Sequence, residues 1–297
     1  MLRNKEKPHN SETETNKILF KKPDLEYMLP RFNVVDMHFH SKYSDGINKI
    51  PVILKHAKKL GIGIAITDHN IVDGAVEACN QQEVLVIPGV EITSTEGPHM
   101  LLYFYNVEDI IDFNDKYLKK NKGKTPMYST KLSVKEIIKI GNKYNCLIVF
   151  AHPYSFGTTG IYTKHFSHKR KHDIIDSVGT FEVINSENFH IWNLMAGVKA
   201  YNLNKGMIGG SDGHTLYHMA KVLTYTKKKK FTDMSKAREY FLDQIKLKQS
   251  RVIGRDVDIL RKFISTVFKI KPNLRKMPGL IMKSTILKIP FIANLIK

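Results

Sequence analysis

The sequence has few cysteines and no long apolar run, and each absence excludes a class of protein. Cys79 and Cys146 are its two cysteines, and they lie far apart in the chain. Two isolated thiols cannot form a disulfide framework or a CxxC metal site, which favours a reducing compartment. No stretch of about 18 apolar residues is present, so a membrane-spanning helix is not expected. Residues 1–22 are polar and lack the apolar core of a signal peptide.

Acidic residues are also scarce relative to basic ones. The chain carries 28 Asp and Glu against 47 Lys and Arg, which gives a formal net charge of +19. Residues 251–297 concentrate this excess, with eleven Lys and Arg against two Asp. A basic balance favours anionic partners such as phosphate esters, nucleic acid or anionic lipid.

The basic tail at residues 251–297 allows three interpretations. Residues 280–297 mix Leu, Ile, Phe and Met with lysines, and Pro290 interrupts them. The pattern suits an amphipathic segment on an anionic membrane surface, an arm that binds nucleic acid, or a helix packed on the preceding domain. We therefore expect a cytoplasmic protein, with a peripheral position at the membrane as the alternative. The sequence does not indicate an oligomeric state.

From Val34 onward, short apolar runs alternate with amphipathic stretches. The alternation predicts a parallel α/β fold with helices outside, and about seven such units favour a closed barrel. We expect a disordered leader at residues 1–33, one domain at 34–250 and the tail at 251–297. The predicted strands are 34–37, 64–67, 84–87, 100–105, 147–151, 181–184, 207–209 and 222–226, and the predicted helices are 50–60, 73–81, 133–144, 191–203 and 235–247.

The polar residues that stand out follow directly after predicted strands or open one. In a parallel barrel the carboxyl ends of the strands share one rim, and that rim carries the chemistry. His38 and His40 are two residues apart on an extended segment, so both side chains point to the same side, and Asp212 and His214 repeat the spacing. The nine candidates for this rim are His38, His40, Asp45, His69, Glu91, His99, His152, Asp212 and His214.

Together the nine candidates indicate a metal centre, although each alone has a plainer interpretation. His99 is compatible with a core histidine, His152 with a loop residue, and the neighbouring Asp68 with a helix cap. Imidazole and carboxylate ligands suit Mn, Fe or Zn, and no thiolate competes. Nine ligands exceed what one tetrahedral ion needs, so we expect two or three divalent ions about 3.5–4 Å apart. Glu91 has two oxygens with which to bridge two ions.

Six short motifs surround these candidates, and in their order they resemble the motifs of the polymerase and histidinol phosphatase (PHP) family. The resemblance runs from about Val34 to about Thr226, and Glu182-Val183-Ile184-Asn185 also resembles the carboxyl-terminal part of small stand-alone members. The six motifs are Asp36-Met37-His38-Phe39-His40, Ser44-Asp45-Gly46, Ile66-Thr67-Asp68-His69-Asn70, Pro88-Gly89-Val90-Glu91-Ile92, Ala151-His152-Pro153 and Gly210-Ser211-Asp212-Gly213-His214.

The resemblance implies a distorted (β/α)7 barrel with a trinuclear metal site. It also implies phosphoester hydrolysis, with nucleotides or the 5′ ends of nucleic acids as the expected substrates. Histidinol phosphate, another small metabolite or phosphotyrosine is the alternative. The implied ligand sets are His38, His40, Glu91 and Asp212 for one ion, Glu91, His99 and His152 for the second, and Asp45, His69 and His214 for the third.

One position departs from the pattern of related phosphoesterases, which often carry an arginine for the substrate phosphate shortly after Ala-His-Pro. Here Tyr154 and Ser155 follow that motif. We expect Lys164, Lys169 or Arg170 to take over this contact. They belong to a basic stretch at residues 164–172, which is either a lid over the rim or a solvated charge run.

The expected reaction uses water activated by the metal ions. Asp212, or a histidine such as His69 or His214, would take or return the proton. No Ser or Cys lies in a nucleophile-elbow motif, so a covalent intermediate is not expected. A metal-stabilised binding module without catalysis is the competing function of a different class.

Overall fold

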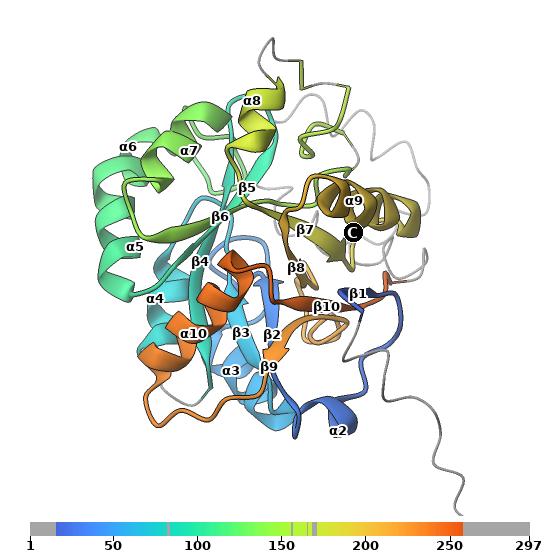
Figure 1. Ribbon diagram of the computed structural model, residues 1–297. Helices are drawn as coiled ribbons and strands as arrows, with labels where there is room; N and C mark the ends of the chain where they lie inside the picture. Colours follow the sequence, from blue (N-terminus) through green and yellow to red (C-terminus); the bar gives the residue numbers. More distant parts are fainter. Residues whose placement is uncertain (1–15, 82–83, 156, 165, 168–170, 258–297) are drawn as a thin grey trace, which may run out of the picture.

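The computed structural model describes residues 16–81, 84–155, 157–164, 166–167 and 171–257. They form a curled central sheet with most helices on its outer side (Figure 1). The strands are β1 (Ile18–Leu19), β2 (Phe32–Phe39), β3 (Gly63–Ile66), β4 (Val86–Thr93), β5 (His99–Phe104), β6 (Cys146–Phe150), β7 (Thr180–Asn185), β8 (Gly206–Gly210), β9 (Val222–Lys227) and β10 (Arg251–Gly254). The helices are α2 (Leu25–Met28), α3 (Ile50–Leu60), α4 (Asp73–Cys79), α5 (Val107–Phe113), the π-helical turn η1 (Asn114–Leu118), α6 (Lys119–Asn121), α7 (Val134–Gly141), α8 (Lys171–Asp176), α9 (His190–Asn202) and α10 (Met234–Lys246).

The sheet is mixed, which corrects the expectation of a purely parallel one. Its strand order is β1-β10-β9-β2-β3-β4-β5-β6-β7-β8. Strands β2, β3 and β4 are parallel to one another, as are β6, β7 and β8, but β5 runs antiparallel to both β4 and β6. Residues 94–98 connect β4 to β5, and so short a connection allows a hairpin but not a parallel crossover. The strands therefore do not confirm an exact (β/α)7 topology.

The sheet curls until its last strand approaches β2, so that the strands form part of a barrel. A parallel bridge joins Phe39 to Gly213, and the His40 amide donates to the Gly213 carbonyl at 2.9 Å. The Gly209 amide donates to Oγ1 of Thr224 in β9 at 2.8 Å. These contacts bring the two halves of the sheet together at the rim that the sequence singles out.

Helix α10 closes the inside of the curled sheet at the end away from this rim. Phe241, Leu242 and Ile245 of α10 pack with buried side chains that point inward from β2 to β6 and β8. The Arg238 side chain is buried and donates to the carbonyls of Val86 and Tyr105, which offsets part of the cost of burying its charge. A second, larger apolar cluster lies mainly between the sheet and the outer helices.

The local signals in the sequence account for several helix boundaries. Pro51 stands in the first turn of α3, and Gly61 ends the helix with a left-handed φ of 72°. Ser133 and Glu136 form a capping box at the start of α7. All the predicted strands and helices are present, with ends that differ by one to three residues for most of them. The predictions missed β1, α2, the run from α5 to α6, α8 and β10.

Residues 16–33 hold regular structure within the range expected to be a leader. Strand β1 pairs in parallel with β10, and α2 is capped by the Asp24 side chain. Residues 1–15 and most of the predicted tail, 258–297, lie outside the described residues. Among the described helices, none combines the length and apolar character needed to cross a membrane.

Candidate metal centre

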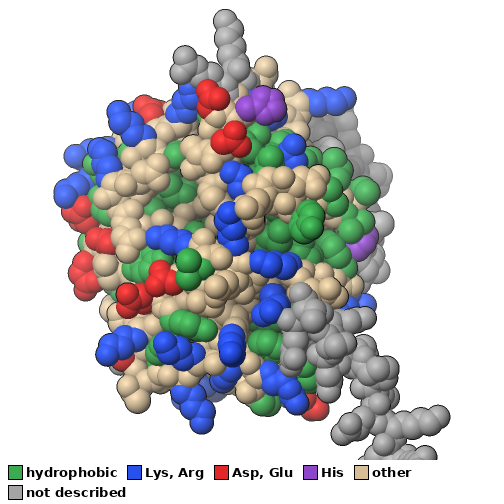
Figure 2. All heavy atoms as spheres, viewed as in Figure 1, with side chains coloured by type: hydrophobic (Ala, Val, Ile, Leu, Met, Phe, Trp, Pro, Cys, Tyr) green, Lys and Arg blue, Asp and Glu red, His purple; other side chains and the backbone are tan. Residues whose placement is uncertain are grey.

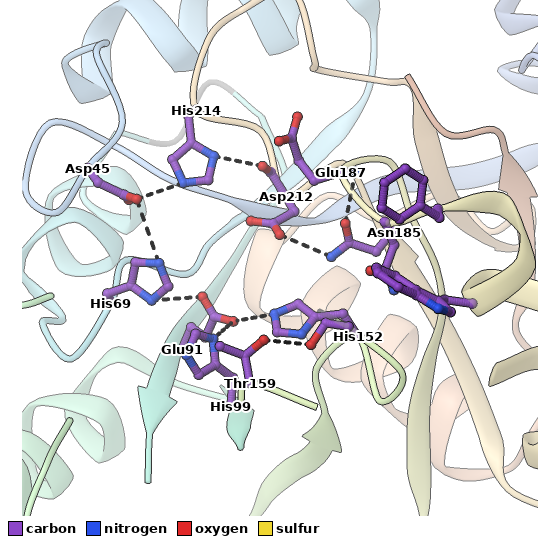
Figure 3. A pocket seen from close by; sticks show the side chains of 14 residues that line it. Asp45, His69, Glu91, His99, His152, Thr159, Asn185, Glu187, Asp212 and His214 are labelled. Atoms are coloured by element: carbon purple, nitrogen blue, oxygen red, sulfur yellow. Dashed lines mark hydrogen bonds and ion pairs between the residues drawn. The ribbon is translucent and has the colours of Figure 1, made fainter. Parts of the chain in front are cut away.

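The nine predicted side chains gather at one rim of the sheet. Figure 3 shows those that also line the cavity, namely Asp45, His69, Glu91, His99, His152, Asp212 and His214. The nine residues follow β2, β3, β6 and β8, lie within β2 and β4, or open β5. His99 is the one predicted residue that does not lie near the carboxyl end of a strand, because it begins β5. The antiparallel direction of β5 explains its place, since His99 pairs in register with Thr93, the last residue of β4.

Glu91 lies at the centre of the cluster and is 1% exposed. Its Oε1 is 2.8 Å from Nδ1 of His99 and 3.0 Å from Nε2 of His152. Its Oε2 is 3.0 Å from Nδ1 of His69, 3.4 Å from Nε2 of His38 and 3.5 Å from Nε2 of the buried His40. One carboxylate therefore faces five imidazoles.

Asp45 forms a second centre of the same kind. Its Oδ2 is 2.9 Å from Nε2 of His214 and 3.8 Å from Nε2 of His69, and its Oδ1 is 3.6 Å from Nδ1 of His40. Asp212 reaches the cluster from the other side, with Oδ1 3.0 Å from Nε2 of His40. All nine predicted residues are thus within one connected set.

Three groups have ligand atoms close enough together to hold an ion. They are His40, Asp45, His69 and His214; His38, His40 and Asp212; and His69, Glu91 and His99. Each group shares at least two residues with one of the three expected ligand sets. The groups differ from those sets in that His40 and His69 each belong to two groups. His152 lies 3.0 Å from Glu91 but belongs to no group.

The donor set fits metal ions better than it fits hydrogen bonding alone. Nδ1 of His69 and Oε2 of Glu91 lie 3.0 Å apart, yet neither makes a hydrogen bond within the described part of the chain. Nε2 of His38 and Nε2 of His40 are 3.2 Å apart. Two ligands bound to a tetrahedral ion at 2.0–2.1 Å would lie about 3.3 Å apart. Buried polar atoms that lack hydrogen-bond partners in this geometry are suited to binding a cation.

Burial and crowding set the charge states of the cluster. Burial raises the pKa of Glu91 and Asp45, but the surrounding imidazoles outweigh it and hold both values well below the usual range. Burial, with His214 and His69 nearby, lowers the pKa of His40 to about 3. Burial also opposes the charged form of His69, but Glu91 and Asp45 outweigh it and raise its pKa to about 9. The acids are therefore charged and ready to bind a cation.

Glu182 supports two of the predicted ligands from behind. Nδ1 of His38 is 2.9 Å from its Oε1, which leaves Nε2 of His38 to face the cluster. Its Oε2 accepts from the His152 amide at 2.7 Å and from the Asn185 side chain at 3.2 Å. Asn185 also donates to Oδ2 of Asp212 at 3.2 Å. Such carboxylate–histidine contacts fix the ring nitrogen that binds a metal.

Asp36 ties the strand that carries His38 to the loops after β8. It is fully buried and accepts from the amides of Ser211 at 2.8 Å and Ala220 at 3.1 Å. Burial raises its pKa to about 6, against the effect of these hydrogen bonds. Ala220 has a φ of 64°, a left-handed value that a non-glycine residue adopts at a cost.

Asp68 holds the loop that presents Asp45 and does not face the cluster as a ligand. Its carboxylate accepts from the Ser41 amide at 2.7 Å, from the Ser41 hydroxyl at 2.6 Å and from the Ser44 hydroxyl at 2.6 Å.

The backbone carries strain at two predicted ligands, because His152 has a φ of 25° and Asp212 a φ of 50°. Such strain persists where the surrounding structure fixes it, as at active sites.

A cavity of about 340 Å³ opens onto the cluster. Its lining includes the carboxylates of Asp45, Glu91, Glu187 and Asp212, and among the described residues no Lys or Arg lines it. Lys164 is exposed and does not line the cavity, and Lys169 and Arg170 lie outside the described residues. The full lining is Asp45, His69, Glu91, His99, His152, Ser155, Thr159, Asn185, Glu187, Asn188, Phe189, Trp192, Asp212 and His214.

Sequence reasoning missed the residues that support the ligands and the aromatic wall of the cavity. Glu182 and Asn185 lie in the last four residues of β7, so the rule used for the other strand ends would have found them. Phe189 and Trp192 stand where α9 begins, with ring centroids 4.7 Å apart and an interplanar angle of 81°. No signal in the sequence distinguishes these two rings from core aromatics.

Comparisons with known proteins agree with this geometry. The family model of the PHP domain matches residues 36–252. No curated protein matches the sequence at the significance required. A two-domain protein from Bacteroides vulgatus that contains a predicted PHP-like metal-dependent phosphoesterase is similar in structure, with a TM-score of 0.53 and 18% identity over 84% of this chain and 73% of that one.

Two structures of Endonuclease Q share the fold as well. The lesion-specific endonuclease from Pyrococcus furiosus has a TM-score of 0.55 and 19% identity over 70% of this chain and 56% of that one. Endonuclease Q in complex with a 27-mer duplex substrate with an abasic lesion at the active site has a TM-score of 0.55 and 21% identity over 70% and 57%. At these sequence identities the similarity shows a shared fold and does not show a shared substrate.

Proposed function

Because the chain belongs to the PHP domain family, we propose that it is a metal-dependent phosphoesterase that hydrolyses phosphate esters at the rim described above. Two or three divalent ions, Mn, Fe or Zn, are the proposed cofactors. The proposed ligands are His38, His40, Asp45, His69, Glu91, His99, His152, Asp212 and His214.

The acidity of the cavity is the observation that carries this proposal. Four carboxylates line it, and no described Lys or Arg offsets them. Imidazoles that carry a proton there, such as His69, must lose it to bind an ion, so bound ions would be the cations that attract a phosphate ester. Two divalent ions alone would balance four carboxylates, and a third would make the site attractive to an anion. A binding module would have no need for this cationic centre inside an open cavity.

The bound ions would supply Lewis acidity, both to activate water and to neutralise the transferred phosphate. The chain itself would hold and move the proton. Asp212 is 14% exposed, faces the cavity, and is oriented by the amide of Asn185, so it can accept a proton from the attacking water. His214 and His69 flank Asp45 on the other wall and are the next candidates for proton transfer.

For the substrate we propose nucleotides or the 5′ ends of nucleic acids. Phe189 and Trp192 provide an aromatic wall beside the metal cluster, and aromatic side chains stack on bases without regard to sequence. The duplex bound to Endonuclease Q, a protein of the same fold, also supports a nucleic-acid substrate. Small-metabolite phosphates and phosphotyrosine remain the competing substrates, and the assay below separates them.

The test measures activity with added Mn²⁺ on a panel of phosphate esters. The panel contains nucleoside 3′,5′-bisphosphates, 5′-phosphorylated oligonucleotides, histidinol phosphate and p-nitrophenyl phosphate. We expect hydrolysis of the first two and loss of activity, with loss of bound metal, in the double variant His38→Ala/His40→Ala. His56→Ala on α3 is the matched control. Full activity in the double variant, or no activity on any ester, would refute the proposal.

A further inference from the structure

A second cavity, of about 300 Å³, is lined mainly by basic side chains. It opens where helix α10 ends and strand β10 begins, and Figure 2 shows Lys and Arg side chains gathered over this part of the molecule. Among the described residues, no Asp or Glu lines it. The described residues that do line it, called the basic cavity below, are Lys17, Lys227, Gln244, Lys248, Gln249 and Arg251.

The basic cavity lies at the end of the sheet opposite to the proposed metal ligands. Lys227 ends β9 and pairs with Phe32, the first residue of β2, whereas Phe39 ends β2 at the rim. The 8 residues of β2 span about 23 Å at roughly 3.3 Å per residue. An anion in the basic cavity would therefore not reach the proposed metal ions.

The cations of the basic cavity lack counter-ions in the part of the chain that the structure describes. Its three lysines and Arg251 form no salt bridge with a described Asp or Glu. Nζ of Lys17 donates to the Lys248 carbonyl, which does not neutralise its charge. Burial, with Arg251 and Lys248 nearby, lowers the pKa of Lys17. Because these cations repel one another, a bound anion would stabilise them.

Hydrogen bonds on both sides fix the turn that carries two of the lining residues. The Gln249 amide donates to the Gln244 carbonyl at 2.8 Å, at the end of α10. The hydroxyl of the buried Ser250 donates to the Met207 carbonyl at 2.7 Å. The turn is thus held in place without a ligand, which lowers the entropic cost of binding one.

Lys248 has a backbone conformation in which glycine is usual. It lies two residues after the end of α10 and has a left-handed φ of 57°. Such a conformation costs a non-glycine residue strain, which is often found where a side chain is needed for function. A lysine here also complements the dipole of α10. That effect accounts for one cation and not for the four that meet in the cavity.

We propose that the basic cavity binds a small anion with two or more phosphate groups, such as an inorganic diphosphate or triphosphate. A terminal phosphate carries a charge of about −1.5 to −2 at pH 7, so an anion with two of them approaches the charge of the four cations. The guanidinium of Arg251 can contact two phosphate oxygens at once, and the lysines supply point charges. An enclosed cavity of this size suits a small molecule, whereas a nucleic-acid backbone follows an extended groove.

Isothermal titration calorimetry with sodium triphosphate tests the proposal. The full-length chain is titrated at low ionic strength in EDTA, because triphosphate also binds divalent ions. Lys248→Gly removes one cation and suits the left-handed backbone, and Lys135→Ala removes an exposed lysine from α7 as the control. We expect the dissociation constant to rise at least about tenfold in the first variant and to stay unchanged in the second. No binding to the unsubstituted chain, or equal affinity in the two variants, would overturn the proposal.

Thermal unfolding gives a second readout that does not depend on how the substitutions alter stability. Triphosphate should raise the midpoint temperature of the unsubstituted chain but not that of the double variant Lys17→Gln/Arg251→Gln. An equal rise in both proteins would place the anion elsewhere. A 5′-phosphorylated oligonucleotide is titrated in parallel. If it binds more tightly than triphosphate and Lys248→Gly weakens it, the cavity belongs to a nucleic-acid surface and the proposal is overturned.

Discussion

Nδ1 of His38 lies 2.9 Å from Oε1 of Glu182, and both side chains are completely buried. The contact leaves Nε2 of His38 to face the cluster of proposed metal ligands. Glu182 also holds the His152 amide, so one carboxylate positions two of the proposed ligands without facing the cavity. Its role can be separated from that of the ligands.

Replacing Glu182 with Gln should weaken metal binding while the domain stays folded. The amide keeps the shape but loses the charge that supports the His38 imidazole. Changes of this kind typically lower metal affinity or activity about 10–100-fold. Titration with Mn²⁺ measures the affinity, far-UV circular dichroism checks the fold, and Glu239→Gln on α10 is the control. An unchanged affinity would show that the contact is only structural.

Metal binding should release protons at neutral pH. His69 has a pKa of about 9 in the metal-free protein, and the pKa of His38 is also raised well above its usual value because Glu182, Asp212 and Glu91 outweigh its burial. Both rings must lose a proton to bind an ion, so the apparent affinity should rise with pH up to about 9. Calorimetry in buffers of different ionisation enthalpy counts the protons. No release between pH 6 and 8 would contradict these charge states.

Replacing Gly210 with Ala should damage both stability and metal binding. A Cβ at this position would lie 2.4 Å from the Cβ and the backbone nitrogen of His38. Overpacking of this kind costs about 1–3 kcal/mol and would displace the ligand. Urea unfolding and metal content are the measurements. Gly179→Ala is the matched control, because nothing lies within 4 Å of its added Cβ. Two variants of equal stability would rule out this clash.

Replacing Trp192 with Ala should affect substrate binding more than metal binding. Stacking on an aromatic side chain contributes about 1–3 kcal/mol per base, so KM for a nucleotide substrate should rise at least several-fold. A phosphate ester of an aliphatic alcohol should show no such rise, because it has no ring to stack. Steady-state kinetics on both esters, with metal content as the control, make the comparison. An equal rise in KM for both substrates would show that Trp192 does not stack on the base of the nucleotide.

The sequence predicted which side chains gather at the rim better than it predicted the strand topology. His38, His40, Asp212 and His214 could be placed from their spacing and from the rule that strand ends share a rim. That rule places His99 at the rim only because β5 is antiparallel, a direction that the short connection at residues 94–98 already implied.

The missed features depend on contacts between segments far apart in the chain. Strand β1 has two residues and depends on its pairing with β10, so no local sequence pattern predicts it. The strand-end rule could have placed Glu182 near the rim, but not its contact with His38, because the two residues are 144 positions apart. The run from α5 to α6 did have a local signal, since Asn106 caps α5 and Glu108 and Asp109 occupy its first turn. That helix could have been predicted.

The pairing of β1 with β10 has a consequence for synthesis of the chain. Ile18 pairs with Val252, so β1, the first strand among the described residues, must wait for 234 further residues before its partner is synthesised. At about 5–20 residues per second this takes roughly ten to fifty seconds. Strand β2 likewise waits for β9. During that interval the nascent sheet has unpaired edges, which makes the period of translation the time when this protein is most prone to aggregate.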